Sequence, residues 1–288
     1  MSVRFSCVVD DHPRFTVQAW IWCTTLRALA GRSSAELVIH VVDGTAGDRI
    51  DYLRGLDVEV RVVPPFDERH AYSNKLVQLG SPALAELDRV VLTDCDIAFA
   101  GPVSELLDVG RPIAAKRVDT GNPDHTHWAR IFAAAGFGPP ETAPGTHIPQ
   151  LTYRYNLNGG VYVLTRPAFE ALGEAWPRWN RWLGDRPEVL DGWAFYRDQV
   201  SFGLAVHELG LPVESLSSRF NFPTQHPNVE AVVPSVLHYH RRFDADGLLL
   251  AHGAPEVDAR IAEVNAALTR HRHTAPSSCV RDQALAPE

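Results

Sequence analysis

The chain has 288 residues, of which 45% are hydrophobic and 22% charged, proportions that are ordinary for a globular protein and exclude a collagen-like or disordered chain. Its formal net charge of -8 argues against a nucleic-acid partner, because contact with phosphate backbones needs clustered Lys and Arg. No apolar run approaches the ~18 residues of a membrane span, and the acidic start MSVRFSCVVDD lacks the layout of a signal peptide. We therefore expect a soluble, cytoplasmic protein without an integral membrane segment.

Short apolar runs alternate with helical patterns in the first third of the chain. In chain order, we expect strands at 3–9, 36–42, 58–63 and 89–93, and helices at 17–29 and 75–87. This alternation predicts an α/β fold with a mostly parallel sheet that is covered by helices on both faces. Ligands bind such sheets at the carboxyl ends of the strands, so the polar residues after each strand are the candidates for a site.

The second half of the chain begins with a long irregular segment, 119–152, which is rich in Gly, Pro, Thr and His and contains one expected helix near 128–135. A long loop inside a compact domain is usually functional, and we expect determinants of substrate choice there. The elements expected next are a strand at 160–164, helices at 167–183 and 196–209, a strand at 232–238 and a helix at 257–271. Residues 1–271 are thus expected to form one domain, followed by a disordered tail at 272–288.

Two acidic clusters follow predicted strands, Asp10–Asp11 after the first and Asp94-Cys95-Asp96 after the fourth. Side-chain alternation places Asp94 and Asp96 on one side of the chain and Cys95 on the other, toward the core. Two carboxylates between apolar runs carry a desolvation cost unless a cation compensates them. Oxygen ligands suit Mg²⁺ or Mn²⁺, so we predict a divalent metal site; the alternative is a structural loop held by ion pairs.

The segments SNKLVQL and LDRVVLTDCDIAFAGPVSEL resemble the helix, strand and metal motif of GT-A fold glycosyltransferases. The resemblance is greatest to the glycosyltransferase family 8 group, which includes glycogenin and lipopolysaccharide galactosyltransferases, and it covers residue 3 to about 240. Its elements occur in the family's order: Val8–Asp11, Lys75, Asp94–Asp96, Asn158–Val161, Asp198-Gln199 and His238–His240. It implies a GT-A (Rossmann-like), mostly parallel mixed sheet flanked by helices. It also implies a nucleotide-sugar donor, a divalent metal, and sugar transfer to an acceptor hydroxyl with retention of configuration.

The resemblance also implies roles for individual residues. The expected donor-binding residues are Asp10, Asp11, Lys75, Asp94, Cys95, Asp96, Gly159 and Arg241, and the expected catalytic residues are Asn158, Asp198 and Gln199. Asp10 and Asp11 would contact the nucleoside, although Asp11 also suits a turn or helix cap before Pro13. Asp198 also suits a helix N-terminus, where a carboxylate is favoured by the helix dipole.

His238 matches the family's third metal ligand, with His240 as the runner-up, since both would lie on the same side of an extended chain. The family's usual continuation, Gly followed by Lys-Pro-Trp, is absent here. Arg241 and the residues Arg242-Phe243-Asp244 stand in its place, and we expect an arginine to contact the diphosphate instead of the missing lysine.

Two other functions are compatible with a metal site on such a sheet. A nucleotidyltransferase would want a glycine-rich phosphate loop after the first strand, where this chain has Asp-Asp-His-Pro. A catalytically decayed protein that binds sugar nucleotides or glycans would not need the intact set of metal ligands. The sequence does not identify the acceptor, a small molecule or a glycan, and it does not determine the oligomeric state.

Overall fold

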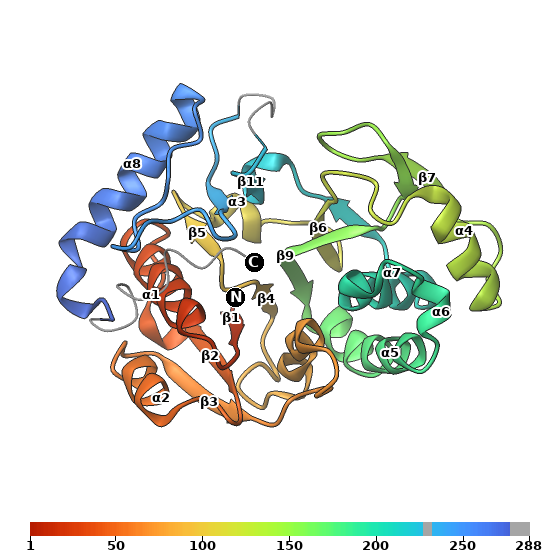
Figure 1. Ribbon diagram of the computed structural model, residues 1–288, viewed down its shortest axis with the longest axis horizontal. Coiled ribbons are helices and arrows are strands. Elements are labelled where there is room, and N and C mark those ends of the chain that lie inside the picture. The colour runs from red at the N-terminus through yellow and green to blue at the C-terminus, as the bar shows by residue number, and fades with distance from the viewer. Residues whose placement is uncertain (227–231, 277–288) are drawn as a thin grey trace.

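The computed structural model describes residues 1–226 and 232–276, and its centre is a seven-stranded sheet (Figure 1). The strands are β1 (Val3–Val9), β2 (Leu37–Val42), β3 (Glu59–Val63), β4 (Arg89–Thr93), β6 (Ile113–Arg117), β9 (Leu157–Thr165) and β10 (Val213–Ser215). Their spatial order is β10-β6-β9-β4-β1-β2-β3, and β9 alone in this sheet runs antiparallel to its neighbours. The predicted mixed, mostly parallel sheet is confirmed.

Two smaller sheets extend the fold. β11 (Phe222–Pro223), β12 (Val236–His238) and β5 (Ile97–Phe99) form one of them, and β7 (Thr142–Pro144) pairs with β8 (Leu151–Tyr153) in the other. β12 runs antiparallel to β5 with His238 opposite Ile97. Because β5 begins directly after the Asp94–Asp96 motif, this pairing brings His238 beside the two aspartates.

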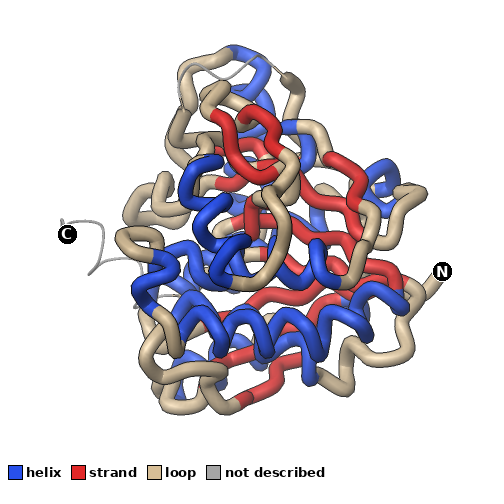
Figure 2. Tube along the Cα trace, turned by 90° about the vertical axis from the view of Figure 1, so that its right-hand side faces the viewer, coloured by secondary structure: helices blue, strands red, loops and turns tan. Residues whose placement is uncertain are grey.

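Helices cover both faces of the central sheet (Figures 1 and 2). The α-helices are α1 (Pro13–Ala28), α2 (Gly47–Arg54), α3 (Ser104–Leu107), α4 (His125–Ala134), α5 (Arg166–Gly184), α6 (Pro187–Leu190), α7 (Arg197–Glu208) and α8 (Pro255–Arg270). The 3₁₀ helices are η1 (Ser34–Glu36), η2 (Ala71–Gly80), η3 (Ala194–Tyr196), η4 (Ser218–Phe220) and η5 (Arg272–Thr274). Within the described ranges no helix is both long enough and apolar enough to cross a bilayer.

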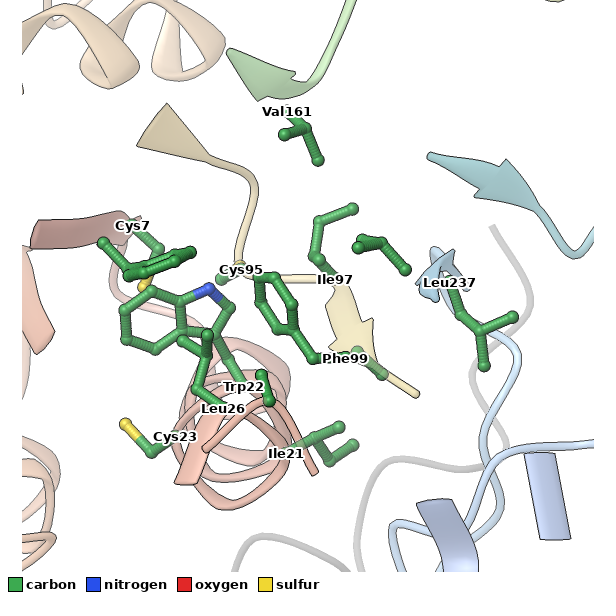
Figure 3. Close-up of a cluster of buried hydrophobic side chains, with 14 of the residues drawn as sticks. Cys7, Ile21, Trp22, Cys23, Leu26, Cys95, Ile97, Phe99, Val161 and Leu237 are labelled. Carbon is green, nitrogen blue, oxygen red and sulfur yellow. The ribbon is translucent and has the colours of Figure 1, made fainter. Parts of the chain in front are cut away.

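Side-chain alternation along the strands divides the core into two clusters. On β9, Val161 and Val163 pack into the cluster with α1, α8 and β5, whereas Tyr162 and Leu164 pack into the cluster with α5 and α7. Figure 3 shows part of the first cluster, in which Cys95 lies near Trp22 and Phe99. Cys95 therefore faces the core, as its position between two aspartates predicts.

Several boundaries differ from those expected. Residues 75–87 do not form an α-helix: η2 ends at Gly80 and turns follow, since Pro82 cannot continue a helical ladder. β12 begins at Val236 rather than at 232, because Pro234 removes a backbone donor. The segment 119–152 contains α4 and the β7–β8 hairpin.

The segment that follows α8 is held against the rest of the fold by hydrogen bonds. Trp20 Nε1 donates to Thr274 Oγ1 at 3.2 Å, and the Tyr52 hydroxyl donates to the Thr274 carbonyl at 2.6 Å. These contacts attach η5 to α1 and α2. Residues 277–288, the remainder of the expected tail, lie outside the described residues.

Candidate active site

A cavity of about 580 Å³ lies at the carboxyl ends of β1 and β4, where the start of the antiparallel β9 reaches the same edge of the sheet. The expected site residues all line it: Asp10, Asp11, Lys75, Asp94, Cys95, Asp96, Asn158, Gly159, Asp198, Gln199, His238, His240 and Arg241. These residues come from positions up to 231 residues apart in the chain. The fold therefore gathers the whole predicted set around one space, as the rule for parallel sheets predicts.

Asp96 lies between two histidines. His238 Nε2 is 3.3 Å from Asp96 Oδ1, and His240 Nδ1 is 3.4 Å from Asp96 Oδ2. His238 Nε2 is also 3.9 Å from Asp94 Oδ2. The backbone at His240 is left-handed, with φ of 52°, a conformation that costs energy for a residue with a side chain and is common at functional sites.

These groups fit a divalent cation. One ligand atom each from Asp96, His238 and His240 lies within 4.8 Å of the others. Asp96 Oδ1 is buried and has no hydrogen-bond partner among the described residues, a state that a bound cation would relieve. Burial raises the pKa of Asp96, but His238 and His240 outweigh this effect and hold that pKa well below its usual value. The anionic carboxylate that a metal needs is thus favoured.

Lys75 lies on the opposite side of the acidic motif. Its Nζ is 2.5 Å from Asp94 Oδ1, donates to the Gly159 carbonyl at 2.9 Å, and is 3.8 Å from Asp198 Oδ2. Burial lowers the pKa of Lys75, but the charges of Asp94 and Asp198 overcome that effect and raise it above the usual value. Lys75 is therefore a fixed positive charge inside the cavity, and it is not a solvated surface lysine.

Two asparagine side chains, Asn158 and Asn221, orient His238 from behind. Asn158 Oδ1 accepts from the Gly160 amide at 2.9 Å and from Asn221 Nδ2 at 2.9 Å. Asn221 Oδ1 then lies 3.1 Å from His238 Nδ1. Because that oxygen can only accept, His238 Nδ1 carries a proton, and Nε2 is the ring nitrogen that faces the aspartates.

Gly160 allows this arrangement by having no side chain. A Cβ at Gly160 would lie 2.7 Å from His238 Nδ1 and 2.9 Å from the Asn221 amide atoms. The glycine pair that the sequence marks as a place for close approach is therefore packed directly against the histidine and the lysine, since Gly159 is similarly close to Lys75.

A buried charged cluster stands behind Asn158. Asn158 Nδ2 lies 3.5 Å from Asp119 Oδ2, and Asp119 is ion-paired with the fully buried Lys116 and with His147. Burial raises the pKa of Asp119, whereas His147 and Lys116 lower it and prevail, so this carboxylate stays charged. The negative charge draws the amide group of Asn158 toward Asp119 and leaves its oxygen for Gly160 and Asn221.

Asp198 and Gln199 lie in the first turn of α7. Burial, with a further contribution from Asp94, raises the pKa of Asp198, and the Lys75 charge opposes that rise. Gln199 Nε2 donates to Asn156 Oδ1 at 2.8 Å, which fixes the direction of its amide group. Asn156 and Asn158 are two residues apart in the sequence, but Asn156 fixes Gln199 whereas Asn158 fixes Asn221.

Asp10 and Asp11 line the cavity directly after β1. Asp10 accepts from Asn74 Nδ2 at 2.8 Å, and burial raises its pKa. Asp11 Oδ1 is 2.5 Å from Arg49 Nη1. The cap of α1 is His12, which accepts from the Arg14 amide, so Asp11 does not serve as the helix cap.

A family model described as the Rhodobacterales glycosyltransferase domain matches residues 6–210 of the chain. The chain belongs to this family. No curated protein matches it. The enzyme is thus a glycosyltransferase, and the matched residues include every site residue named above except Asn221, His238, His240 and Arg241.

Solved structures share the glycosyltransferase's fold. A crystal structure of the galactosyltransferase LgtC in complex with donor and acceptor sugar analogues has a TM-score of 0.59 and 17% identity, over 93% of this chain and 99% of that chain. Apo mouse xyloside xylosyltransferase 1 has a TM-score of 0.51 and 15% identity, over 83% and 98%. GlyE from Streptococcus pneumoniae TIGR4 has a TM-score of 0.52 and 14% identity, over 93% and 63%. These likenesses support the GT-A fold.

Sequence reasoning missed several residues of the glycosyltransferase site, among them Asn221 and Gln18. Asn221 was not singled out, because an asparagine after a short 3₁₀ helix has no local pattern that separates it from a turn residue. Gln18, on α1, accepts from Cys95 Sγ at 3.5 Å and donates to the His240 carbonyl at 2.6 Å. A polar residue in the otherwise apolar stretch Val17–Cys23 was the available signal for Gln18.

Proposed function

We propose that the enzyme moves a sugar from a nucleotide-sugar donor to an acceptor hydroxyl, with Mn²⁺ or Mg²⁺ held by Asp94, Asp96 and His238. His240 is proposed as a further ligand. The observation that carries this proposal is the convergence of Asp96, His238 and His240 at the cavity, where the buried Asp96 Oδ1 accepts no hydrogen bond from the described residues. Asp94 lies beside this group, with its Oδ2 3.9 Å from His238 Nε2. When bound, a divalent cation would offset the charge of the donor diphosphate.

The residues around this group suit the parts of such a donor. Asp10 and Asp11 offer carboxylate acceptors to the hydroxyl and N–H groups of a nucleoside. Arg241, which lines the cavity beside His240, offers a charged donor for a diphosphate. Gly159 lets the backbone approach the donor, and Cys95 lines the cavity with its side chain packed in the core.

Lys75, Asp198, Gln199 and Asn158 surround the space proposed for the donor sugar. The Lys75 ammonium is near two carboxylates and is aimed into the cavity, where it would stabilise negative charge on the departing diphosphate. Asp198 and Gln199 present a carboxylate and an amide to the sugar, at the side where positive charge develops on the anomeric carbon. Transfer with retention of configuration belongs to this proposal and rests on the resemblance to family 8 enzymes.

Release of nucleoside diphosphate from a panel of nucleotide sugars with MnCl₂ tests the proposal. We expect Asp94→Asn and Asp96→Asn to lower the rate by about 10² to 10³, because each removes charge stabilisation at the leaving group. Asp51→Asn is the control, since Asp51 forms an exposed pair with Arg54 on α2 and does not line the cavity. Full activity of Asp96→Asn, or of the wild type in EDTA, would contradict the metal site.

Ligand binding gives a second test that does not depend on turnover. A donor or nucleoside diphosphate at ~100 times its dissociation constant should stabilise the fold by about 2.7 kcal/mol, seen as a rise in melting temperature that EDTA abolishes. A protein that binds the donor in this way but releases no nucleoside diphosphate in a single turnover would be the catalytically decayed alternative.

A further inference from the structure

Tyr72 and Phe195 are exposed aromatic side chains that touch each other at the cavity. Their exposed fractions are 50% and 54%, and their ring centroids lie 4.2 Å apart with a tilt of 56°. Both line the cavity that contains Lys75 and Asp198. Exposed apolar side chains are common singly, but an exposed pair on the wall of a large cavity is typical of a ligand site.

The backbone beneath this pair is held by a network of polar contacts. His70 Nε2 lies 2.9 Å from the Ala194 carbonyl and so joins the start of η2 to η3. Arg197 donates to Ser73 Oγ at 3.0 Å and to Asp67 Oδ2 at 2.8 Å, which joins the same two segments a second time. Backbone segments held in this way need little further ordering when a ligand binds.

The pair lies one helical turn before the charged groups of the proposed sugar site. Tyr72 precedes Lys75 by three residues, and Phe195 precedes Asp198 by three residues. Three residues advance a helix by roughly 5–6 Å, a step comparable with the size of one sugar ring. The side chains of Lys75 and Asp198 are only 10% and 13% exposed. The aromatic pair therefore lies nearer the solvent, and the two charged groups lie deeper in the cavity.

Further aromatic side chains line the cavity beside Asp10 and Asp11. His12 and Phe15 line the cavity beside Asp10 and Asp11, with ring centroids 5.9 Å apart. The Arg14 guanidinium lies 4.9 Å from the Phe15 ring centroid. A nucleobase packed against these rings would leave Tyr72 and Phe195 for the second substrate.

We propose that Tyr72 and Phe195 form a stacking platform for a pyranose ring of the acceptor, which makes the acceptor a saccharide or glycoside. The inference deepens the proposed function and rests on it. The C–H face of a pyranose packs against aromatic faces, and the Tyr72 hydroxyl adds a polar edge for the sugar's own hydroxyls. A ring on this platform directs its hydroxyls inward to the place between Lys75 and Asp198.

Saturation-transfer NMR on the full chain, with diamagnetic MgCl₂ and UDP present, tests the platform with three probes: methyl β-D-galactopyranoside, methyl β-D-glucopyranoside and methyl α-D-mannopyranoside. We expect at least one pyranoside to bind the wild type. Tyr72→Ala and Phe195→Ala should each weaken that binding by about 2- to 10-fold, and Phe195→Trp should restore it. Val62→Ala is the control, since Val62 is 42% exposed on β3 and does not line the cavity.

Two outcomes would overturn the platform. One is the absence of saturation transfer to any of the three pyranosides, or transfer that both alanine variants leave unchanged. The other is a loss of affinity for UDP, GDP or ADP in the alanine variants with pyranoside binding intact, which would place a nucleobase on the rings. Failure of the proposed function is separate: the wild type would then release no nucleoside diphosphate from any nucleotide sugar, whatever the NMR shows.

Discussion

Asn221 Oδ1 lies 3.1 Å from His238 Nδ1, and this contact places a proton on Nδ1. Asn221 does not line the cavity, yet it orients the ring of His238, a proposed metal ligand. The amide of Asn221 cannot reverse its direction, because its Nδ2 donates to an Asn158 oxygen that already accepts from the Gly160 amide. The buried charge of Asp119 orients the amide of Asn158, which in turn orients the amide of Asn221. This contact fixes the ring orientation in which His238 Nε2 faces Asp94 and Asp96.

Asn221→Ala should weaken Mn²⁺ binding by about 10- to 100-fold, because a histidine ligand without its hydrogen-bond partner loses its fixed tautomer and orientation. Isothermal titration with MnCl₂ measures this directly. Asn265→Ala is the matched control: Asn265 also makes two hydrogen bonds, to the Leu249 backbone beside α8. Equal Mn²⁺ affinity in the wild type and the Asn221 variant would show that the contact has no positioning role.

Gly159→Ala should lower kcat/KM for the donor by at least about 10-fold while the protein still folds. A Cβ at Gly159 would lie 2.5 Å from Lys75 Nζ, and the flexible lysine would move away from Asp94 rather than the backbone moving. Gly173→Ala on α5 is the control, since its nearest neighbour would be 3.9 Å away. That change should be neutral or stabilise by about 0.4–1 kcal/mol in a urea titration. Unchanged donor kinetics in Gly159→Ala would be evidence against a role for Lys75.

His40 should make the folded state sensitive to mild acid. It is fully buried on β2, 3.0 Å from Ser6 Oγ, and burial, with help from Arg61, lowers its pKa from 6.5 to about 4. Between pH 4 and pH 6.5, His40 binds a proton in the unfolded chain but stays neutral in the folded chain. The titration of His40 therefore does not lower the free energy of unfolding above pH 6.5, and it lowers that free energy by about 3 kcal/mol as the pH falls to 4.

Urea unfolding at several pH values between 4 and 7, for the wild type and for His40→Gln, isolates this contribution. The free-energy difference between the two proteins should shrink or reverse by about 3 kcal/mol as the pH falls, because the variant cannot titrate at this position. Parallel pH profiles would mean that His40 is not the group responsible.

Lys116→Met should destabilise the protein by about 3–5 kcal/mol, because it leaves the Asp119 carboxylate buried without its lysine. Adding Asp119→Asn should recover part of that loss, since the uncompensated charge is then removed. Arg54→Met provides the comparison on the surface, where breaking the exposed pair with Asp51 should cost less than about 1 kcal/mol. Urea unfolding of the wild type, Lys116→Met, Asp119→Asn and the double variant decides, and additive effects of the two substitutions would refute the coupling.

The sequence by itself determined the features that depend on neighbouring residues. Alternation within the Asp94-Cys95-Asp96 motif was enough to place Cys95 in the core, and the apolar runs before Asp10 and Asp94 were enough to place both clusters at strand ends. Local patterns failed at Lys75, where the expected α-helix is a 3₁₀ helix ended by Gly80 and Pro82.

The tertiary structure alone decided which side chains meet. The β5–β12 register sets His238 opposite Ile97, a pairing across 141 residues that no local pattern encodes. The structure also brings His240 to Asp96 through a left-handed backbone, and Asn221 to His238 through η4 and β11. Periodicity reports which face of an element is buried, but contacts between distant segments depend on strand register and packing, which only the folded chain fixes.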